Sequence, residues 1–397
     1  MVGFTLVMQF LAMGTGFYVF SVLLVPLTEA LQADRFLVSL ALSLQTLFGA
    51  LVSPWVGKMV AERSVRGLMW AGAGLMGIGF FMLSQTTALW QLFVSFGLMV
   101  GAGVTLTGAL PCNALLTNWF FDRRGTALGI SQFGITISGT VLVPLASHLV
   151  LNFGWQSVPM TFAIAIPVIM IPLTWKFAVK CPEDMGLYAD GAAAPPVVIT
   201  GDAHSWTFTR ALRDPQVRLL ALLVGPPFMG IGTVVLGMHS HATDTGLSVM
   251  QASSVVAFMT ACGAAAKPLF GMLADRFDKR WAMAISLCCQ LGGLALIILL
   301  DSYVGLILAG CLFGLGYGGI MPLWTVLIAT FFGREAFARV MGLMFPMTVP
   351  FTLAGLPFAT FMFETTGSYI PAFTILLTGF AGALFVLWRL PMSDAPR

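Results

Sequence analysis

The chain has 397 residues, of which 58% are hydrophobic and only 9% are charged, and its mean hydropathy is +0.94. A single soluble core cannot bury this much apolar surface, so the composition excludes an ordinary water-soluble protein and indicates a membrane protein. The net charge of +3 is small, and we expect no nucleic-acid partner.

Apolar runs long enough to cross a bilayer recur along the whole chain. A hydrocarbon core about 30 Å thick needs about 20 apolar residues in a helix, and Gly, Pro or charged residues separate twelve such runs. The runs are continuous, whereas the strands of a membrane β-barrel alternate apolar and polar residues, so a barrel is excluded. We therefore predict an all-α membrane protein with twelve transmembrane helices, at about 4–27, 36–56, 68–84, 90–117, 126–147, 155–175, 217–238, 249–270, 281–300, 303–330, 339–363 and 369–390.

Basic residues are unevenly distributed between the loops on the two sides of the predicted spans. Of the 19 Lys and Arg, all but Arg35 and Lys267 fall on the side that holds both termini. Cytoplasmic loops carry an excess of Lys and Arg, so both termini and the long central loop are predicted to be cytoplasmic. The opening residues, MVGFTL, lack the basic region of a signal peptide, so the first run should stay as a helix. We expect a multi-pass protein of the plasma membrane, which in a bacterium is the inner membrane.

One long polar stretch divides the chain into two halves of six predicted spans each. Residues 176–216 contain GAAAPPVVITGDAHS, which is typical of a flexible linker, so we predict an N-terminal bundle over 1–175 and a C-terminal bundle over 217–397. The halves also resemble each other, because FFDR at 120–123 corresponds to FFGR at 331–334. Two six-helix halves in parallel repeat, with a site between them near the middle of the membrane, are typical of transporters.

The segment GMLADRFDKR, residues 271–280, resembles a signature of the major facilitator superfamily, G-x-L-A-D-R-x-G-R-K/R. Members of this superfamily carry the signature between helices 2 and 3 and again between helices 8 and 9. Here Asp278 replaces its second glycine, and the first copy, GKMVAERSVR, is weaker, with Ala61 at the aspartate position and Glu62 at the following arginine. The resemblance covers nearly the whole chain and implies the major facilitator fold, with two six-helix pseudo-repeats.

A second stretch narrows the resemblance to one branch. NWFFDRRGTALGISQFGITISG, residues 118–139, is similar to the helix 4 to 5 motif of monocarboxylate porters and of the bacterial oxalate:formate antiporters. The shared features are an aromatic pair, the basic residues that follow it, and glycines at helical spacing. Helix 1 departs from the branch, because it lacks the acidic-Gly signature of many animal monocarboxylate porters.

The signature loops are expected to act as a conformational latch, which is their role in the superfamily. The excess of Lys and Arg in cytoplasmic loops explains the basic residues of the second copy. Acidic residues contribute little to orientation, so Asp275 needs another role. Its carboxylate would accept hydrogen bonds from the N–H groups at the N-terminus of a neighbouring helix. The resemblance assigns the latch to Gly271, Asp275, Arg276 and Arg280, and in the first copy to Gly57 and Arg66.

Lys267 is the only formally charged side chain inside a predicted span. A lysine at mid-bilayer depth costs about 2.5–3.5 kcal/mol on insertion scales. Two interpretations are open: the ammonium binds the carboxylate of an anionic substrate, or the side chain has a structural role, in which it snorkels to the membrane surface or forms a pair within the protein. Carboxylate porters often carry Arg-Pro a turn before the glycine of the signature, and Lys267-Pro268 before Gly271 resembles this pair, which favours substrate binding. Lysine keeps the charge but lacks the bidentate fork of arginine.

Five further side chains inside spans are candidates for the walls of a substrate cavity: Tyr18, Asn113, Gln132, Tyr317 and Trp324. A small-ligand site needs a few polar groups that converge in an apolar pocket. Each of the five alone is more typical of an interhelical hydrogen bond or an interfacial anchor, so only the set favours a site.

No pattern in the sequence indicates an enzyme. The six cysteines lack the paired spacing of a metal site, and His239-x-His241 without a nearby acid is a weak metal signal. GAGLMG at 72–77 and GLGYGG at 314–319 fit G-x-G-x-x-G, but neither lies between a strand and a helix, so they indicate helix packing or a hinge rather than dinucleotide binding. We expect no catalytic residue, no cofactor and no metal.

The sequence therefore predicts a monomeric secondary active transporter that moves small organic anions, most simply monocarboxylates, by alternating access. The alternative within transport is an exporter of amphipathic or drug-like compounds, which an apolar cavity favours and Lys267 disfavours. A transporter-like sensor is a further alternative. Besides the substrate and the lipid bilayer, the partners would be a coupling proton or a counter-anion. The predicted spans contain no carboxylate, so symport, exchange and uniport all stay open.

Overall fold

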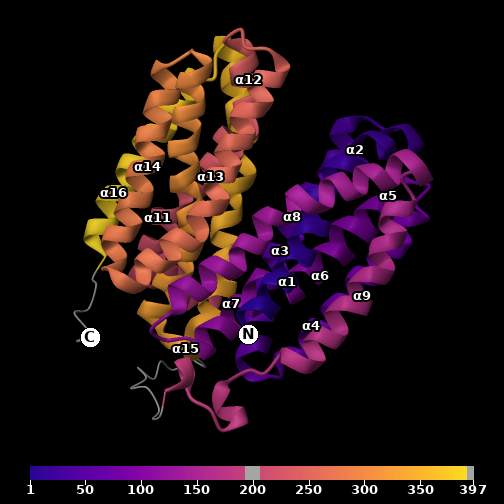
Figure 1. The fold of residues 1–397 in the computed structure, drawn as a ribbon, viewed down its shortest axis with the longest axis vertical. Coiled ribbons are helices and arrows are strands. Elements are labelled where there is room, and N and C mark those ends of the chain that lie inside the picture. The colour runs from indigo at the N-terminus through magenta and orange to yellow at the C-terminus, as the bar shows by residue number, and fades with distance from the viewer. Residues whose placement is uncertain (193–205, 391–397) are drawn as a thin grey trace. The chain divides into compact units, whose positions relative to one another are not determined.

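The computed structural model describes residues 1–192 and 206–390, and every regular element in these ranges is helical (Figure 1). The chain forms two compact units. Unit 1 contains Met1–Trp206 and Phe332–Pro346, and unit 2 contains Thr207–Phe331 and Met347–Arg397. The predicted bundle boundaries at 175 and 217 stay a prediction, and residues 193–205 of the predicted linker lie outside the described residues.

Unit 1 holds the first six apolar segments in chain order. The first and the fourth contain wider π-helical turns, whereas the others are continuous α-helices. The elements are α1 (Val2–Met13), η1 (Gly14–Tyr18), α2 (Val19–Ala30), α3 (Arg35–Glu62), α4 (Val65–Ser84), α5 (Leu89–Leu92), η2 (Phe93–Val100), α6 (Gly101–Thr107), α7 (Ala109–Trp119), α8 (Arg124–Phe153), α9 (Ser157–Phe177), η3 (Pro182–Met185) and η4 (Ala189–Gly191).

Unit 2 repeats this pattern, and a π-helical turn again interrupts its first apolar segment. Its elements, together with the arm of α15 that belongs to unit 1, are α10 (Phe208–Arg213), α11 (Pro215–Gly230), η6 (Ile231–Val235), α12 (Leu236–Asp244), α13 (Val249–Arg276), α14 (Lys279–Leu299), α15 (Tyr303–Thr366) and α16 (Ile370–Arg389).

The 64-residue helix α15 contains two of the predicted spans. At 1.5 Å per residue a continuous helix of this length would extend for about 96 Å, about three times the thickness of a hydrocarbon core. Gly333 divides it, because its φ of 70° and ψ of 173° are not helical and belong to a region that glycine alone adopts readily. Among the described residues, eleven apolar helices are long enough to span a membrane, and because α15 contains two spans they correspond to the twelve predicted ones. The all-helical architecture is confirmed for the described residues.

The two G-x-G-x-x-G stretches lie inside helices α4 and α15. In α15, a Cβ atom at Gly314 or Gly318 would lie 2.2 or 2.1 Å from the carbonyl oxygen of Met259 or Gly263 in α13. The two helices thus meet at backbone contact, which only glycine permits. In α4, a Cβ at Gly72 would lie 2.6 Å from the Cβ of Leu106. Both stretches serve helix packing.

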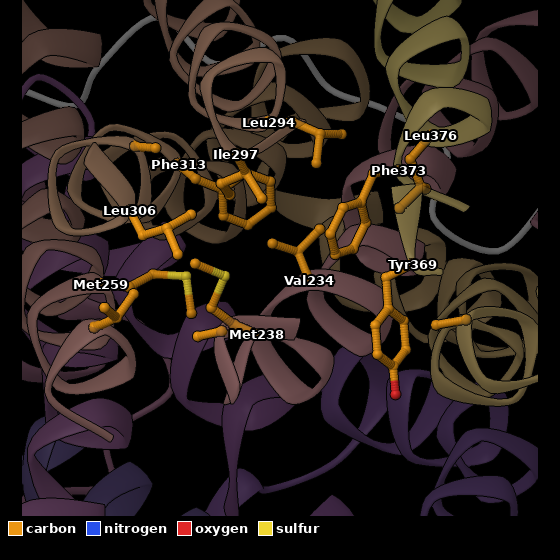
Figure 2. Packing of buried hydrophobic residues seen from close by; sticks show 14 of the residues in the cluster. Val234, Met238, Met259, Leu294, Ile297, Leu306, Phe313, Tyr369, Phe373 and Leu376 are labelled. Atoms are coloured by element: carbon orange, nitrogen blue, oxygen red, sulfur yellow. The ribbon is translucent and has the colours of Figure 1, made fainter. Parts of the chain in front are cut away.

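An apolar cluster fills the interior of unit 2 and includes side chains from several helices (Figure 2). Val234, Met259, Phe313 and Phe373, from η6, α13, α15 and α16, are each 0% exposed. Because lipid tails are as apolar as these side chains, the gain here comes mainly from close packing rather than from removal of water. The cluster fixes α13, the helix that carries Lys267.

Candidate functional site

Lys267 lies on the buried face of α13, and only 6% of its surface is exposed. A snorkelling lysine extends its ammonium to the surface of the protein. The burial of Lys267 places its side chain in the protein interior, which suits substrate binding or a structural pair better than snorkelling. Its role in binding a substrate stays a prediction.

Tyr317 lies against α13 one helical turn before Lys267, within unit 2. A Cβ atom built at Gly263 would come within 2.6 Å of the hydroxyl oxygen of Tyr317. Gly263 is one helical turn before Lys267, and residues at this spacing share one helix face. The Tyr317 hydroxyl of α15 therefore lies against the stretch of α13 that presents Lys267. The ring of Tyr317 is only partly buried.

Trp324, two turns further along α15, is 1% exposed, and its ring packs edge-on against Phe228 of α11 with centroids 5.4 Å apart. This contact joins two helices of unit 2. Trp324 therefore stabilises the packing of these helices and does not present an open surface to a ligand.

The candidate residues of unit 1 also differ in how far they are buried. Tyr18 ends the π-helical turn η1, and its partly buried ring covers Gly139 of α8, where an added Cβ would lie 3.0 Å from the ring. π-helical turns inside α-helices are frequent at functional sites. Asn113 of α7 and Gln132 of α8 are each 2% exposed. Tyr18 is thus the more accessible of the three.

Gln9 of α1, which sequence reasoning missed, connects two of these helices. Its Nε2 donates to Asn113 Oδ1 over 3.3 Å and to Ser131 Oγ over 2.8 Å, and Gln9 and Ser131 are both 0% exposed. Asn113 therefore forms an interhelical hydrogen bond, as the structural alternative predicted. A glutamine within an apolar run was the signal that could have found Gln9.

The first signature copy packs against the 332–346 segment of α15, and both belong to unit 1. A Cβ at Gly57 would lie 2.4 Å from the carbonyl oxygen of Ala338. Next to this contact, Ser53 Oγ donates to the carbonyl of Gly342 over 2.8 Å. Glu62, five residues after Gly57, forms an ion pair with the guanidinium of Arg339. The first copy lacks the aspartate of the signature, yet an acid at the next position engages this helix.

Arg339 is 7% exposed and was not among the predicted site residues. Its partner Glu62 is 277 positions away in the chain, so no local pattern could reveal the pair. Arg66, which was predicted for the latch, lies in the first turn of α4 and lines a pocket with Arg63 and Lys180.

The second signature copy lies at the turn between α13 and α14. Asp278, the residue that replaces the glycine of the signature, caps α14, and its carboxylate accepts from the Arg280 N–H over 2.7 Å. Asp at such a position stabilises a helix by about 1 kcal/mol. The Arg280 guanidinium donates to the carbonyl of Leu390 over 2.6 Å and lies 5.5 Å from the ring of Trp388. Arg280 thus connects α14 to the end of α16.

The remaining residues of this copy differ in exposure. Gly271 is buried, Asp275 is half-buried, and Arg276 is exposed at the end of α13. The latch function assigned to them stays a prediction.

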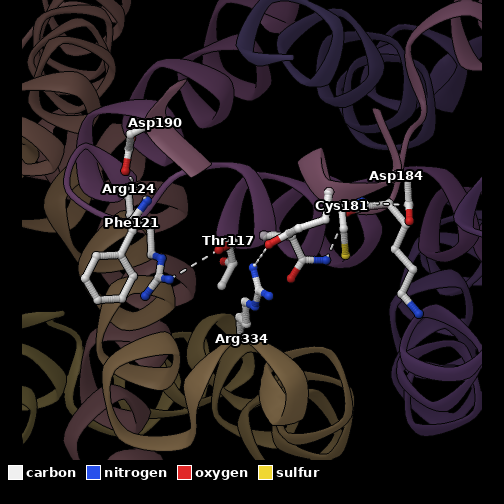
Figure 3. A network of polar contacts seen from close by, with 10 residues as sticks. Thr117, Phe121, Arg124, Cys181, Asp184, Asp190 and Arg334 are labelled. Carbon is white, nitrogen blue, oxygen red and sulfur yellow. Dashed lines mark hydrogen bonds and ion pairs between the residues drawn. The ribbon is translucent and has the colours of Figure 1, made fainter. Parts of the chain in front are cut away.

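The stretch that resembles the porter motif forms a network of polar contacts at the end of α7 (Figure 3). Arg124 is 8% exposed and donates from Nε to the carbonyl of Phe120 over 3.1 Å and from its terminal nitrogen to that of Thr117 over 3.2 Å. These carbonyls end a helix, where a cation is favourable. Asp190 of η4 accepts from the N–H groups of Phe121 and Asp122 over 2.7 and 2.8 Å.

The segment after α9 is joined to α15 by an ion pair. Arg334 donates to Glu183 over 2.7 Å, and both side chains are partly exposed. Desolvation alone would raise the pKa of the Glu183 carboxyl, but the hydrogen bond and the charge of Arg334 outweigh it and lower the pKa. Burial raises the pKa of the nearby Cys181 thiol, and the carboxylates of Glu183 and Asp184 raise it further.

These features match a known family. A family model described as Major Facilitator Superfamily matches residues 5–238 and 221–397. The chain belongs to the Major Facilitator Superfamily.

Relatives and a solved structure extend the match. "Uncharacterized transporter ESBP6" of Saccharomyces cerevisiae is 26% identical over 325 residues, which are 81% of this chain and 47% of the yeast protein, so the chain spans about half of its length. "Monocarboxylate transporter 12" of Rattus norvegicus is 28% identical over 344 residues, 79% of this chain and 68% of the rat protein. The structure of the Escherichia coli fucose:proton symporter superposes with a TM-score of 0.71 at 15% identity and covers 99% of both chains. That likeness shows a shared fold.

In the part of this major facilitator chain that the structure describes, no three His, Cys, Asp or Glu side chains are grouped so as to hold a metal ion. His241 of the His-x-His pair is 4% exposed and packs edge-on against Phe373 with ring centroids 5.1 Å apart. His241 therefore has a packing role in unit 2.

Proposed function

We propose that this protein is a secondary active transporter that moves small organic anions, and monocarboxylates in particular, by alternating access. The buried Lys267, one helical turn from the contact between Gly263 and the Tyr317 hydroxyl, is the observation that carries this proposal. The proposal explains why a charged side chain, which costs free energy inside a membrane, lies in this helix. An anionic substrate supplies the negative charge that lowers this cost when it binds.

The chemistry of the two side chains suits a carboxylate. The Lys267 ammonium offers three donors and a positive charge, and the Tyr317 hydroxyl offers one more donor. Hydrogen bonds between an ammonium and a carboxylate are about twice as strong as neutral ones. A neutral substrate of the same shape would not offer the negative charge of a carboxylate, so this lysine favours the carboxylate.

The names of the relatives support the same substrate class. The rat relative that matches 79% of this chain is named a monocarboxylate transporter. The basic residue of α13 is a lysine, which holds a carboxylate by its charge without fixing the orientation of its plane. Lys267 is therefore suited to several small monocarboxylates rather than to one.

The latch belongs to this proposal. The Gly57–Ala338 contact and the Glu62–Arg339 ion pair hold α3 against the 332–346 arm of α15. We assign this crossing to one conformation of the transport cycle, in which the ion pair forms, and its separation to the opposite conformation. Both termini lie on the cytoplasmic side in the orientation that the basic residues favour.

Counterflow in proteoliposomes tests the proposal. Purified protein is reconstituted, vesicles are loaded with unlabelled lactate, and uptake of radiolabelled lactate is followed. Lactamide, the neutral analogue of nearly the same shape, serves as the matched competitor. The proposal predicts lactate counterflow that pyruvate competes away and lactamide does not. Equal competition by lactamide, or uptake of an amphipathic dye with no counterflow of any monocarboxylate, would refute it.

A further inference from the structure

Unit 1 contains a pocket of about 500 Å³ away from the residues proposed to bind the substrate. One wall is the turn between α3 and α4, residues 62–66, and the other is the segment that follows α9, which includes residues 178–180 and Asp184. Both walls lie at helix ends on the same side of unit 1, because α3 and α9 each run toward this side and α4 starts from it.

The pocket has an excess of positive charge. Arg63, Arg66 and Lys180 line it together with two carboxylates, those of Glu62 and Asp184. The charge of Glu62 is already compensated by the ion pair with Arg339. Asp184 Oδ2 accepts from the Cys181 N–H over 3.2 Å. Three cations thus face one uncompensated carboxylate, which favours an anionic ligand.

The N-terminus of the 20-residue helix α4 opens into the same pocket. Ser64 is its N-cap residue, but the Ser64 side chain makes no capping hydrogen bond to the first turn. The first N–H groups of a helix have no acceptor in their own helix, and their partial positive charge attracts anions. A Cβ built at Gly67 meets nothing within 4 Å, so side-chain volume does not close the first turn.

Arg66 gives a second, independent indication of a ligand. Its Nε is buried and has no hydrogen-bond partner among the described residues. A buried guanidinium nitrogen without an acceptor is costly. An oxyanion in the pocket that Arg66 lines would compensate the charge of this guanidinium.

The opposite wall is held in place by hydrogen bonds. The Trp119 indole donates to the carbonyl of Val179 over 2.9 Å, and the Asn118 amide donates to that of Lys180 over 3.1 Å. Lys180 itself donates from Nζ to the carbonyl of Ala61. These bonds fix the backbone that carries Lys180 relative to α7 and α3, so this side of the pocket is preorganised.

Exposed aromatic residues show the depth of the pocket in the membrane. Trp175 and Phe177, at the end of α9 just before the pocket wall, are 65% and 40% exposed. Aromatic side chains are enriched where the apolar core of a bilayer meets water. The pocket follows them directly in the chain and therefore lies at the level of the lipid headgroups.

We propose that this pocket binds a phosphate oxyanion, supplied by the headgroup of an anionic phospholipid or by free phosphate. The side chains of Arg63, Arg66 and Lys180 and the first N–H groups of α4 are its donors. Basic pockets between helix ends bind lipid headgroups in the same way. The ligand would hold the α3–α4 turn against the segment after α9 and so stabilise the end of α3 that carries Glu62.

Two probes and a set of full-length variants test the proposal. Delipidated protein in a neutral detergent is titrated with inorganic phosphate, followed by thermal shift, and with phosphatidylglycerol against phosphatidylcholine, followed by native mass spectrometry. Arg66→Gln removes a donor, and Lys58→Gln, an exposed lysine of α3 outside the pocket, is the matched control. Ser64→Asp places a carboxylate at the N-cap, where it competes with the ligand while it stabilises the helix.

Phosphate or phosphatidylglycerol should bind the wild type and Lys58→Gln equally. Arg66→Gln should bind about tenfold more weakly or worse, the effect of losing one charge-assisted hydrogen bond. Ser64→Asp should lose binding while melting at the same or a higher temperature, which separates the effect from misfolding. Binding of phosphatidylglycerol alone identifies the lipid as the source, and binding of phosphate alone identifies the free ion. The proposal is overturned if neither probe binds the wild type, or if Arg66→Gln and Ser64→Asp bind the probe as tightly as the wild type does.

Discussion

Gly57→Ala tests the crossing of α3 with the 332–346 arm of α15. The new Cβ would lie 2.4 Å from the carbonyl oxygen of Ala338, whereas ordinary contacts of this kind begin at 3.4 Å, so the two helices must separate by about 1 Å. Overpacking of this kind costs about 1–3 kcal/mol. The same shift would stretch the 2.8 Å hydrogen bond from Ser53 to Gly342, which is worth about 0.5–1.5 kcal/mol.

Alanine also has a higher helix propensity than glycine, which offsets about 0.5–1 kcal/mol of this destabilisation. The net destabilisation is about 2 kcal/mol, equivalent to a melting temperature about 4–8 °C lower for a cooperative unit of this size. Gly74→Ala in α4 is the matched control, because its Cβ meets nothing within 4 Å and it gains the propensity alone. Thermal unfolding of the purified proteins and initial counterflow rates are measured together. If Gly57→Ala melts and transports like Gly74→Ala, the close helix contact is wrong.

Three further predictions concern other regions of the chain. Gln9→Leu should lower the melting temperature, since the buried Asn113 oxygen loses a donor at a cost of about 1–3 kcal/mol; an unchanged melting temperature would exclude a stabilising role for this hydrogen bond. Asp275→Asn should slow the initial transport rate at unchanged membrane abundance, and an unchanged rate would leave the second signature copy with a role in orientation alone. Cys181, kept as the single cysteine, should react with an impermeant maleimide in inside-out vesicles but not in intact cells. Because burial and neighbouring carboxylates raise the pKa of its thiol, less thiolate is present at neutral pH than for an ordinary cysteine, and labelling should still increase above the usual thiol pKa. Labelling in intact cells would reverse the proposed orientation.

The helical spans could be predicted from the sequence because each apolar run must satisfy its backbone polar groups internally in a membrane. The helix ends could not be predicted from hydropathy, since helices continue past the apolar core. The span predicted at 36–56 extends to Glu62 in α3, and the following turn is only two residues long. The bend at Gly333 has a local cause in glycine, and the sequence indicated a break there.

The polar contacts between helices were harder to predict. Gln9 and its partners Asn113 and Ser131 are 104 and 122 positions apart in the chain, and only the packing of α1 against α7 and α8 brings them together. The ion pair of Glu62 with Arg339 has the same origin. Lys267, by contrast, could be found from the sequence alone, because an isolated charge in an apolar run needs a reason to be there.

The affinity of Lys267 variants for a monocarboxylate tests the central proposal most directly. The ligand is first identified by counterflow, and its dissociation constant is then measured on purified protein by titration, with thermal shift as a second readout. Lys267→Gln should weaken binding about 10- to 150-fold, as expected for the loss of a charge-assisted hydrogen bond, whereas Lys267→Arg should retain part of the affinity because the charge remains. Lys58→Gln, the exposed control, should bind like the wild type. If Lys267→Gln binds the same monocarboxylate with unchanged affinity, Lys267 does not hold the substrate and the proposed anion specificity is wrong.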